Sequence, residues 1–152
     1  MSFRISGLPA ALFEHLFLLS DAELTEHRAV RSVAAGGYPC RISLTDADKG
    51  DTVILVNYLH QPAHSPYRSS YAIYVREGEQ TYDAIDQVPE QLRRRILSVR
   101  GFDDDGMITD ADIAEGPQLE HIIGQFFDNE RTRYLHLHFA KPGCYAARVD
   151  RT

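Results

Sequence analysis

Two histidines separated by one residue are the sharpest chemical feature of this chain. His136 and His138 lie in the segment YLHLHF, residues 134–139, in which polar and apolar side chains alternate. Side chains at i and i+2 share a face of a β-strand, so the pattern predicts both imidazoles beside Tyr134, with the apolar side chains on the other face. Two neutral imidazoles side by side can serve acid–base catalysis or bind a metal ion.

This pair alone does not favour a metal site, because a working centre needs at least one more protein ligand. His136 and His138 are therefore candidate catalytic residues and candidate metal ligands without a complete coordination set. The alternative interpretation is a polar face that is half-exposed or hydrogen-bonded within the protein.

Residues 57–68, with the sequence NYLHQPAHSPYR, are the best source of further groups, and His60 is the third candidate for catalysis. Loops that follow a rigid strand often carry binding groups, and arginine holds anions through paired donors. We expect a pocket for a small polar or anionic molecule. The candidate ligand-binding residues are Arg41, Asn57, His60, Tyr67, Arg68 and His138. In the alternative, Tyr67 covers the core and Arg68 pairs with a local acid.

The two cysteines, Cys40 and Cys144, lie far apart and form no Cys-x-x-Cys pair, so we expect free thiols. The side of the sheet on which Cys144 lies depends on the register of a predicted hairpin formed by residues 132–139 and 144–150. A four-residue loop, 140–143, places the thiol away from both histidines, whereas a three-residue loop places it on the side of His138. A buried structural cysteine is the commoner case.

The segment GFDDDGMITDAD, residues 101–112, resembles a calcium-binding loop only superficially. A glycine, Gly101, occupies the first ligand position, and Asp112 stands where such loops have a bidentate glutamate. We therefore interpret this segment as an acidic surface turn.

The elements that must position these residues are predicted from hydrophobic periodicity. A helix over residues 117–128 is the clearest, because its apolar residues recur at i, i+3, i+4, i+7 and i+8. Strand 52–59 is apolar on both faces, which is typical of a central strand. The other predicted strands are 3–6, 70–75, 132–139 and 144–150, and the other predicted helices are 9–19, 21–27, with a Ser20–Glu23 capping box, and 90–97. The pattern predicts one α+β domain, residues 1–152, with a mainly antiparallel sheet of about five to seven strands and helices packed against it.

The composition excludes several function classes. The chain has 152 residues, of which 43% are hydrophobic, and a formal charge of −6, so we expect no affinity for nucleic acid or anionic membranes. No window approaches the roughly 20 apolar residues of a membrane helix. Glu14 and His15 interrupt the apolar run near the amino terminus, which argues against a secretory signal and predicts a cytoplasmic protein.

Five short motifs, taken together with their spacing, resemble those of a known family. They are PCR at 39–41, NY at 57–58, PYR at 66–68, HLH at 136–138 and PGC at 142–144. In this order they resemble the bacterial family catalogued as domain of unknown function 1203, over nearly the whole chain from residue 3 to residue 151. The resemblance implies that these motifs belong together, and it brings no activity, cofactor or catalytic residue with it. The chain departs from the family at Phe139, where members tend to carry a polar residue.

Three functional hypotheses remain from the sequence. The favoured one is binding, or binding and turnover, of a small polar or anionic molecule at a pocket lined by His, Arg and Tyr. The second is a non-catalytic interaction protein that forms a homodimer or holds a protein partner through a sheet edge or face. The third is a metal-dependent enzyme that uses His136 and His138. No cofactor is firmly implied.

Overall fold

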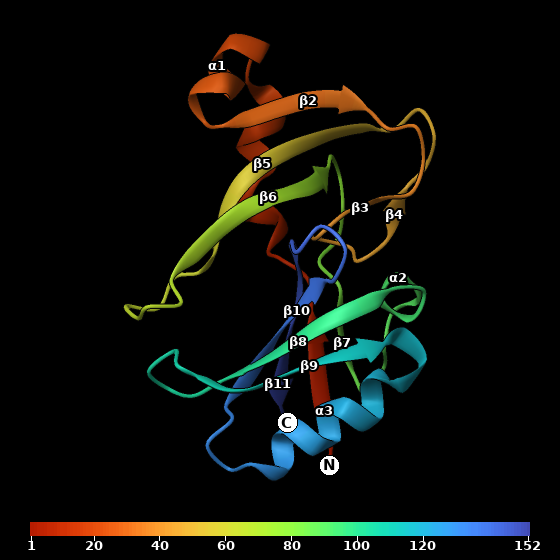
Figure 1. The fold of residues 1–152 in the computed structure, drawn as a ribbon. Coiled ribbons are helices and arrows are strands. Elements are labelled where there is room, and N and C mark those ends of the chain that lie inside the picture. The colour runs from red at the N-terminus through yellow and green to blue at the C-terminus, as the bar shows by residue number, and fades with distance from the viewer.

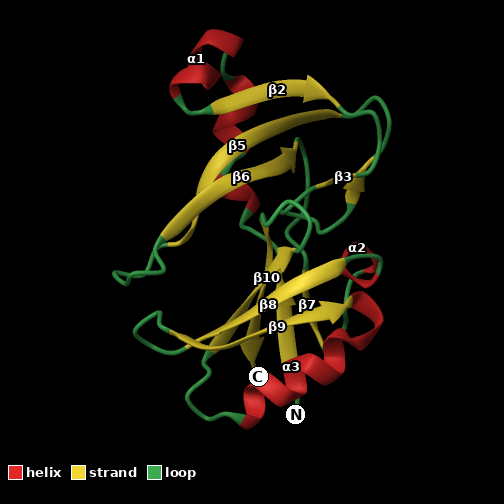
Figure 2. Cartoon of the chain, in the orientation of Figure 1, coloured by secondary structure: helices red, strands yellow, loops and turns green.

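The computed structural model describes residues 1–152 and is built around two antiparallel sheets that face each other (Figures 1 and 2). The six-stranded sheet has, in spatial order, β7 (Asp83–Ile85), β1 (Phe3–Ser6), β11 (Tyr145–Arg151), β10 (Tyr134–Phe139), β8 (Ile96–Phe102) and β9 (Ile108–Glu115). The three-stranded sheet has β2 (Ala29–Val33), β5 (Thr52–Gln61) and β6 (Ser69–Arg76), and a small ribbon pairs β3 (Tyr38–Pro39) with β4 (Asp46–Ala47). The predicted α+β class with a mainly antiparallel sheet is confirmed.

Helix α3 (Leu119–Asp128) covers one face of the six-stranded sheet, below it in Figure 1, and follows a 3₁₀ turn, η3 (Gly116–Gln118). Its apolar stripe enters the larger core cluster, as the periodicity predicts. The fully buried members are Leu119, Ile123, Phe126 and Phe127, while Ile122 is partly buried. None of the helices combines the length and apolar character that crossing a membrane requires.

The three-stranded sheet has its own core, which it shares with the amino-terminal segment. The helix predicted over residues 9–19 is wrong: this segment forms two 3₁₀ turns, η1 (Ala10–Leu12) and η2 (Glu14–Leu18), followed by α1 (Asp21–Glu26). The backbone of Phe13, with φ −119°, ends the first turn and brings Phe13 and Leu16 into the core, leaving Leu12 50% exposed. The predicted Ser20–Glu23 capping box is present at the start of α1.

Strand β5 is the central strand of the small sheet, as its apolar sequence predicts. Both faces are buried at Val53 and Ile54, but Leu55 is only partly buried and Asn57 is exposed, so the prediction of full burial is wrong for the outer half. The strand also continues to Gln61, through a register shift between Tyr58 and Gln61. His60 therefore lies on a strand instead of in a loop.

In the middle of the chain one predicted helix is wrong and the predicted acidic turn is shorter than expected. The helix predicted over residues 90–97 is a single turn, α2 (Glu90–Arg93), because the following residues alternate as a strand in which Leu97 and Val99 are buried and Ile96 is 47% exposed. The acidic turn is confined to residues 103–107, and the chain then forms β9 at the edge of the sheet. An edge strand tolerates acidic side chains, which hid this strand from a search for apolar alternation.

The β10–β11 hairpin has the four-residue loop, 140–143. The Phe139 amide donates to the Cys144 carbonyl at 2.9 Å, and His138 lies opposite Tyr145. Cys144 thus faces the α3 side, away from both histidines, and packs in the larger core. Both cysteines are free and buried.

Candidate functional site

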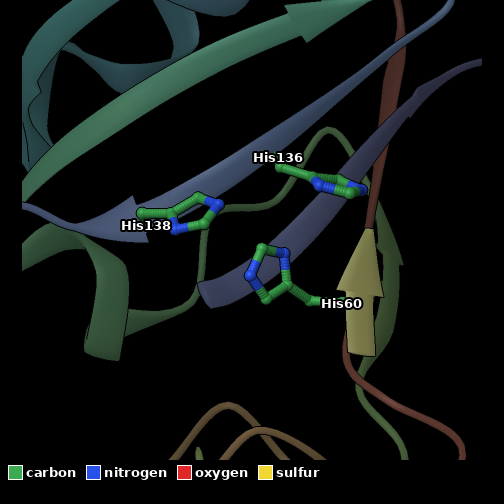
Figure 3. A group of neighbouring side chains, drawn as sticks. All are labelled: His60, His136 and His138. Atoms are coloured by element: carbon green, nitrogen blue, oxygen red, sulfur yellow. The ribbon is translucent and has the colours of Figure 1, made fainter. Parts of the chain in front are cut away.

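Three histidines meet between the two sheets. His136 and His138 project from β10, and His60 reaches them from the end of β5, so that the three rings point toward one another (Figure 3). One ring nitrogen from each residue lies within 4.8 Å of the other two. The side chains are buried, with exposures of 9% for His60, 3% for His136 and 1% for His138. The structure thus joins His60 to a pair that the sequence placed on one face.

The hydrogen bonds leave ring nitrogens of this three-histidine cluster without partners. Nδ1 of His138 lies 3.0 Å from the carbonyl oxygen of Gly143. Because a carbonyl can only accept, Nδ1 carries the proton and Nε2 keeps its lone pair. Nδ1 of His60 and Nδ1 of His136 are buried and have no hydrogen-bond partner. Buried polar atoms without partners are rare. They indicate either a site for a bound ligand or a place where the folded state is destabilised.

Burial keeps all three rings neutral. It is the largest cause of a pKa lowered to about 4 for His60, to about 3 for His136 and to about 4 for His138. Neighbouring positive charge adds to the effect, and Arg100 acts on the pKa of each of the three. At neutral pH the three imidazoles are therefore unprotonated and carry free lone pairs. Neutral imidazole is the form that binds metals.

Aromatic rings hold the histidines in place. Tyr145, on β11, stacks on His60 with centroids 5.5 Å apart and meets His136 edge-on at 5.2 Å. Phe102 and Tyr134 pack against His136 from the other side, at 5.1 and 5.2 Å. Such contacts restrict ring rotation, so the cluster is organised before any ligand arrives.

Arginines flank His136 on both neighbouring strands. Arg100 on β8 and Arg148 on β11 are its register partners, and directly opposed residues project from the same face of a sheet. Arg148 is neutralised by Asp150, with nitrogen–oxygen distances of 2.8 to 2.9 Å, and lies 4.1 Å over the Tyr134 ring. The only side-chain partner of Arg100 is the Ser98 hydroxyl, at 3.3 Å, so its charge has no carboxylate partner.

A cleft of about 880 Å³ reaches the cluster from the side of β1 and β11. Its lining residues include His60, His136 and Tyr145, together with Tyr58 and Arg148. This size is within the range of small-molecule sites, which are concave and carry a few polar groups among apolar ones. A small polar molecule can therefore approach two of the three histidines directly.

The arrangement fits a divalent transition-metal ion. Three neutral imidazoles are the protein ligands of one kind of catalytic zinc site, in which the fourth position stays open. Tetrahedral Zn–N bonds of about 2.0–2.1 Å place the nitrogens roughly 3.4 Å apart, so nitrogens that lie within 4.8 Å of one another must approach by up to about 1.4 Å to coordinate one ion. The His138–Gly143 hydrogen bond is the kind of second contact that orients a metal-binding imidazole.

The other predicted ligand-binding residues lie elsewhere. Arg41 is 1% exposed, and its guanidinium donates to the carbonyls of Tyr145 and Pro39 and to Sγ of Cys144. Its donors are therefore used inside the core.

The remaining three candidates lie on the surface. Asn57 and Tyr67 are exposed, and Arg68 is exposed and donates to the Pro62 carbonyl. None of the three lines the cleft that reaches the histidines. Of the predicted set, the structure brings only His60 and His138 into the cluster, together with the catalytic candidate His136.

Sequence reasoning missed Arg100, Arg148 and Tyr145. Arg148 belongs to a strand that the sequence predicts, but a regular hairpin with the four-residue loop would place Ala147 opposite His136. A register shift between Leu137 and His138 brings Arg148 to that position instead. Arg100 lies between the helix predicted over residues 90–97 and the acidic segment 101–112, in a strand-like stretch for which the sequence gives no strand bounds or partner. Nothing in the sequence therefore places it beside His136. Tyr145 is opposite His138 in the four-residue loop, which was one of the two registers considered.

Comparison with known proteins identifies a family and nothing more specific. The family described as "Protein of unknown function (DUF1203)" matches residues 37–151, which include His60, His136 and His138. No curated protein and no solved structure matches the chain. The match spans most of the sequence, and the chain therefore belongs to the DUF1203 family.

Proposed function

We propose that this protein is a zinc-type metalloprotein in which His60, His136 and His138 hold one divalent transition-metal ion. The observation that carries the proposal is the convergence of three buried, neutral imidazoles whose ring nitrogens lie within 4.8 Å of one another. Structural histidines in a core normally satisfy both ring nitrogens, whereas two of these rings have a buried Nδ1 without a partner.

The ligand set selects the class of ion. Magnesium and calcium prefer oxygen ligands, and no carboxylate belongs to the cluster. Imidazole favours zinc, copper, nickel and iron, and three imidazoles with an open position match catalytic zinc. A structural zinc site would instead close its coordination with a fourth protein ligand.

The fourth coordination position of the proposed ion, which no protein ligand fills, is where a small molecule would bind. The cleft leads to His60 and His136, so a small polar molecule entering it can take the remaining coordination position. A zinc-type ion polarises such a molecule, or lowers the pKa of bound water toward neutrality. The function that this arrangement supports is binding and turnover of a small polar molecule at the metal, which joins two of the hypotheses that the sequence left separate.

The test is calorimetric titration of Zn²⁺ into protein purified without a histidine tag and stripped with a chelator. We expect one ion per chain for the wild type. His138→Ala should lower the affinity about 100-fold or more, because a ligand is worth at least as much as the second-shell contacts that tune it. His121→Ala removes an exposed imidazole from α3 and is the matched control.

Equal loss of affinity in His138→Ala and His121→Ala would contradict the proposal, because it would place the ion on surface histidines. Absence of stoichiometric binding to the wild type would also contradict it. Circular dichroism of each variant establishes that the fold is retained.

A further inference from the structure

The surroundings of the three-histidine cluster are positively charged. The charged side chains that act on the pKa values of the three rings are Arg100, Arg148 and Arg41, and no aspartate or glutamate is among them. A divalent ion held by neutral imidazoles keeps its full charge, because none of its ligands is an anion. With the metal bound, the pocket would therefore hold a large uncompensated positive charge.

The cleft itself does not cancel this charge. Its two aspartates, Asp83 and Asp150, are each engaged by an arginine, Arg4 and Arg148 respectively. Arg41 also has no acidic partner, but its donors are taken by the carbonyls of Tyr145 and Pro39 and by Sγ of Cys144. Arg100 has only the Ser98 hydroxyl as a side-chain partner, is partly buried, and is the register neighbour of His136. A partly buried guanidinium without a carboxylate is costly unless an anion compensates it.

We infer that the open position of the metal binds an anionic group of a small molecule, with Arg100 as the residue that compensates its charge. The inference rests on the proposed metal centre and names the class of molecule that it selects. The shared chemistry is a compact oxyanion, either a carboxylate or a phosphate group. A neutral amide or alcohol of the same shape would leave the charges of the ion and of Arg100 uncompensated.

Position explains the assignment to Arg100. Opposed residues on antiparallel strands have Cβ atoms roughly 4.5–5.5 Å apart, and the arginine side chain is longer than that distance. Arg100 does not line the cleft itself, but its side chain is long enough for the guanidinium to reach an anion bound beside His136 while Nε keeps the Ser98 hydroxyl. Arg148, the partner on the opposite side, is already engaged by Asp150 and packed on Tyr134.

The experiment uses the Co²⁺-substituted protein, since cobalt occupies zinc-type sites and its visible spectrum reports the ligands. Sodium acetate, inorganic phosphate and neutral acetamide are titrated in turn at constant ionic strength. We expect a saturable spectral change with acetate or phosphate and none with acetamide, and the comparison of acetate with phosphate identifies which oxyanion the site prefers.

Two arginine variants locate the anion. Arg100→Gln should weaken the anion about tenfold or more, as expected for loss of a charged hydrogen bond, while cobalt affinity stays within about threefold. Arg94→Gln removes an exposed arginine that pairs with Glu90 on α2 and should leave anion affinity unchanged.

The possible failures are distinguishable. If cobalt binds at the histidines and neither anion changes its spectrum, or acetamide binds as well as acetate, the anion inference is overturned and the metal centre stands. If Arg100→Gln binds the anions like the wild type, the assignment of Arg100 as the compensating residue is overturned. If cobalt does not bind, the metal centre itself is contradicted.

Discussion

On strand β10 both faces of the six-stranded sheet are buried, but their side chains differ in chemical character. On β10, Leu135 and Leu137 point toward α3, and His136 and His138 point toward the small sheet. All four side chains are at most 3% exposed. The α3 face is filled with apolar side chains, whereas the histidine face encloses polar rings whose nitrogens are in part unpaired.

The difference teaches that burial alone does not say which residues stabilise the fold. Burial of an apolar side chain on the α3 face lowers the free energy of the folded state. Burial of an imidazole without a partner raises it, because hydration is lost and no hydrogen bond replaces it. The histidine face therefore gives up stability, as expected of a preorganised binding site.

The largest expected effect is the loss of stability in acid, which should come from the histidine face. In the unfolded chain these histidines have a pKa of about 6.5. In the folded chain the pKa is lowered to about 4 for His60 and His138 and to about 3 for His136. The unfolded state then binds more protons, so the free energy of unfolding falls as pH drops from about 6.5 toward 4, by roughly 2 kcal/mol or more per histidine. Urea melts of metal-free protein across this range measure the loss.

The control is His136→Leu, which removes one of the three titrating rings. Its unfolding free energy should depend on pH less steeply than that of the wild type, by up to about 1.4 kcal/mol per pH unit between pH 5 and 6. Identical slopes would mean that His136 is protonated as readily in the folded protein as in the unfolded chain.

Truncation on the α3 face should give the next largest effect. Phe126→Ala leaves a cavity between α3 and the sheet and should lower the free energy of unfolding by roughly 3–5 kcal/mol. Leu119→Ala should cost about 2–5 kcal/mol for the same reason. Urea melts at pH 7.5 provide the measurement, and a loss below about 0.5 kcal/mol for both variants would mean that α3 is peripheral to the core.

Replacing a buried histidine by an apolar residue should instead raise the free energy of unfolding. At pH 7.5 without metal, His136→Leu removes the unpaired Nδ1 from a pocket of aromatic rings and should raise the free energy of unfolding by about 1 kcal/mol. In a separate titration the same variant should not bind Zn²⁺ stoichiometrically. A destabilisation of more than about 1 kcal/mol would instead identify His136 as a structural residue.

The turn after β5 should matter least. Tyr67→Ser and Arg68→Gln alter exposed side chains that do not line the cleft. We expect each to change stability by less than about 0.5 kcal/mol and zinc affinity by less than about threefold. A larger loss of zinc affinity would extend the site to this turn and revive the pocket predicted from residues 57–68.

Local pattern was enough to predict part of this molecule. The alternation in residues 134–139 places both histidines on one face, and the stripe of α3 identifies the cover of the other face. Both depend on neighbours within one element, where the period of a strand or a helix fixes the direction of a side chain. The spacing of Cys40 and Cys144 predicts free thiols, which is confirmed, and both thiols are buried.

Contacts between strands could not be predicted in the same way. His60 was assigned to a loop, and only the extension of β5 through a register shift carries its ring to β10. Arg100 is a neighbour of His136 through the β8–β10 pairing, and only the first two residues of β8 fall within the helix predicted over residues 90–97. Pairing depends on register across long sequence separations, which single-segment periodicity does not contain.

The central claim is that His60, from one sheet, and His136 and His138, from the other, hold a single ion. Native mass spectrometry of zinc-loaded His60→Leu and His64→Leu tests it most directly, because both variants remove a histidine from neighbouring positions and only His60 belongs to the cluster. We predict one zinc ion on the wild type and on His64→Leu, and none on His60→Leu. Retention of zinc by His60→Leu, or its absence from the wild type, would contradict the account.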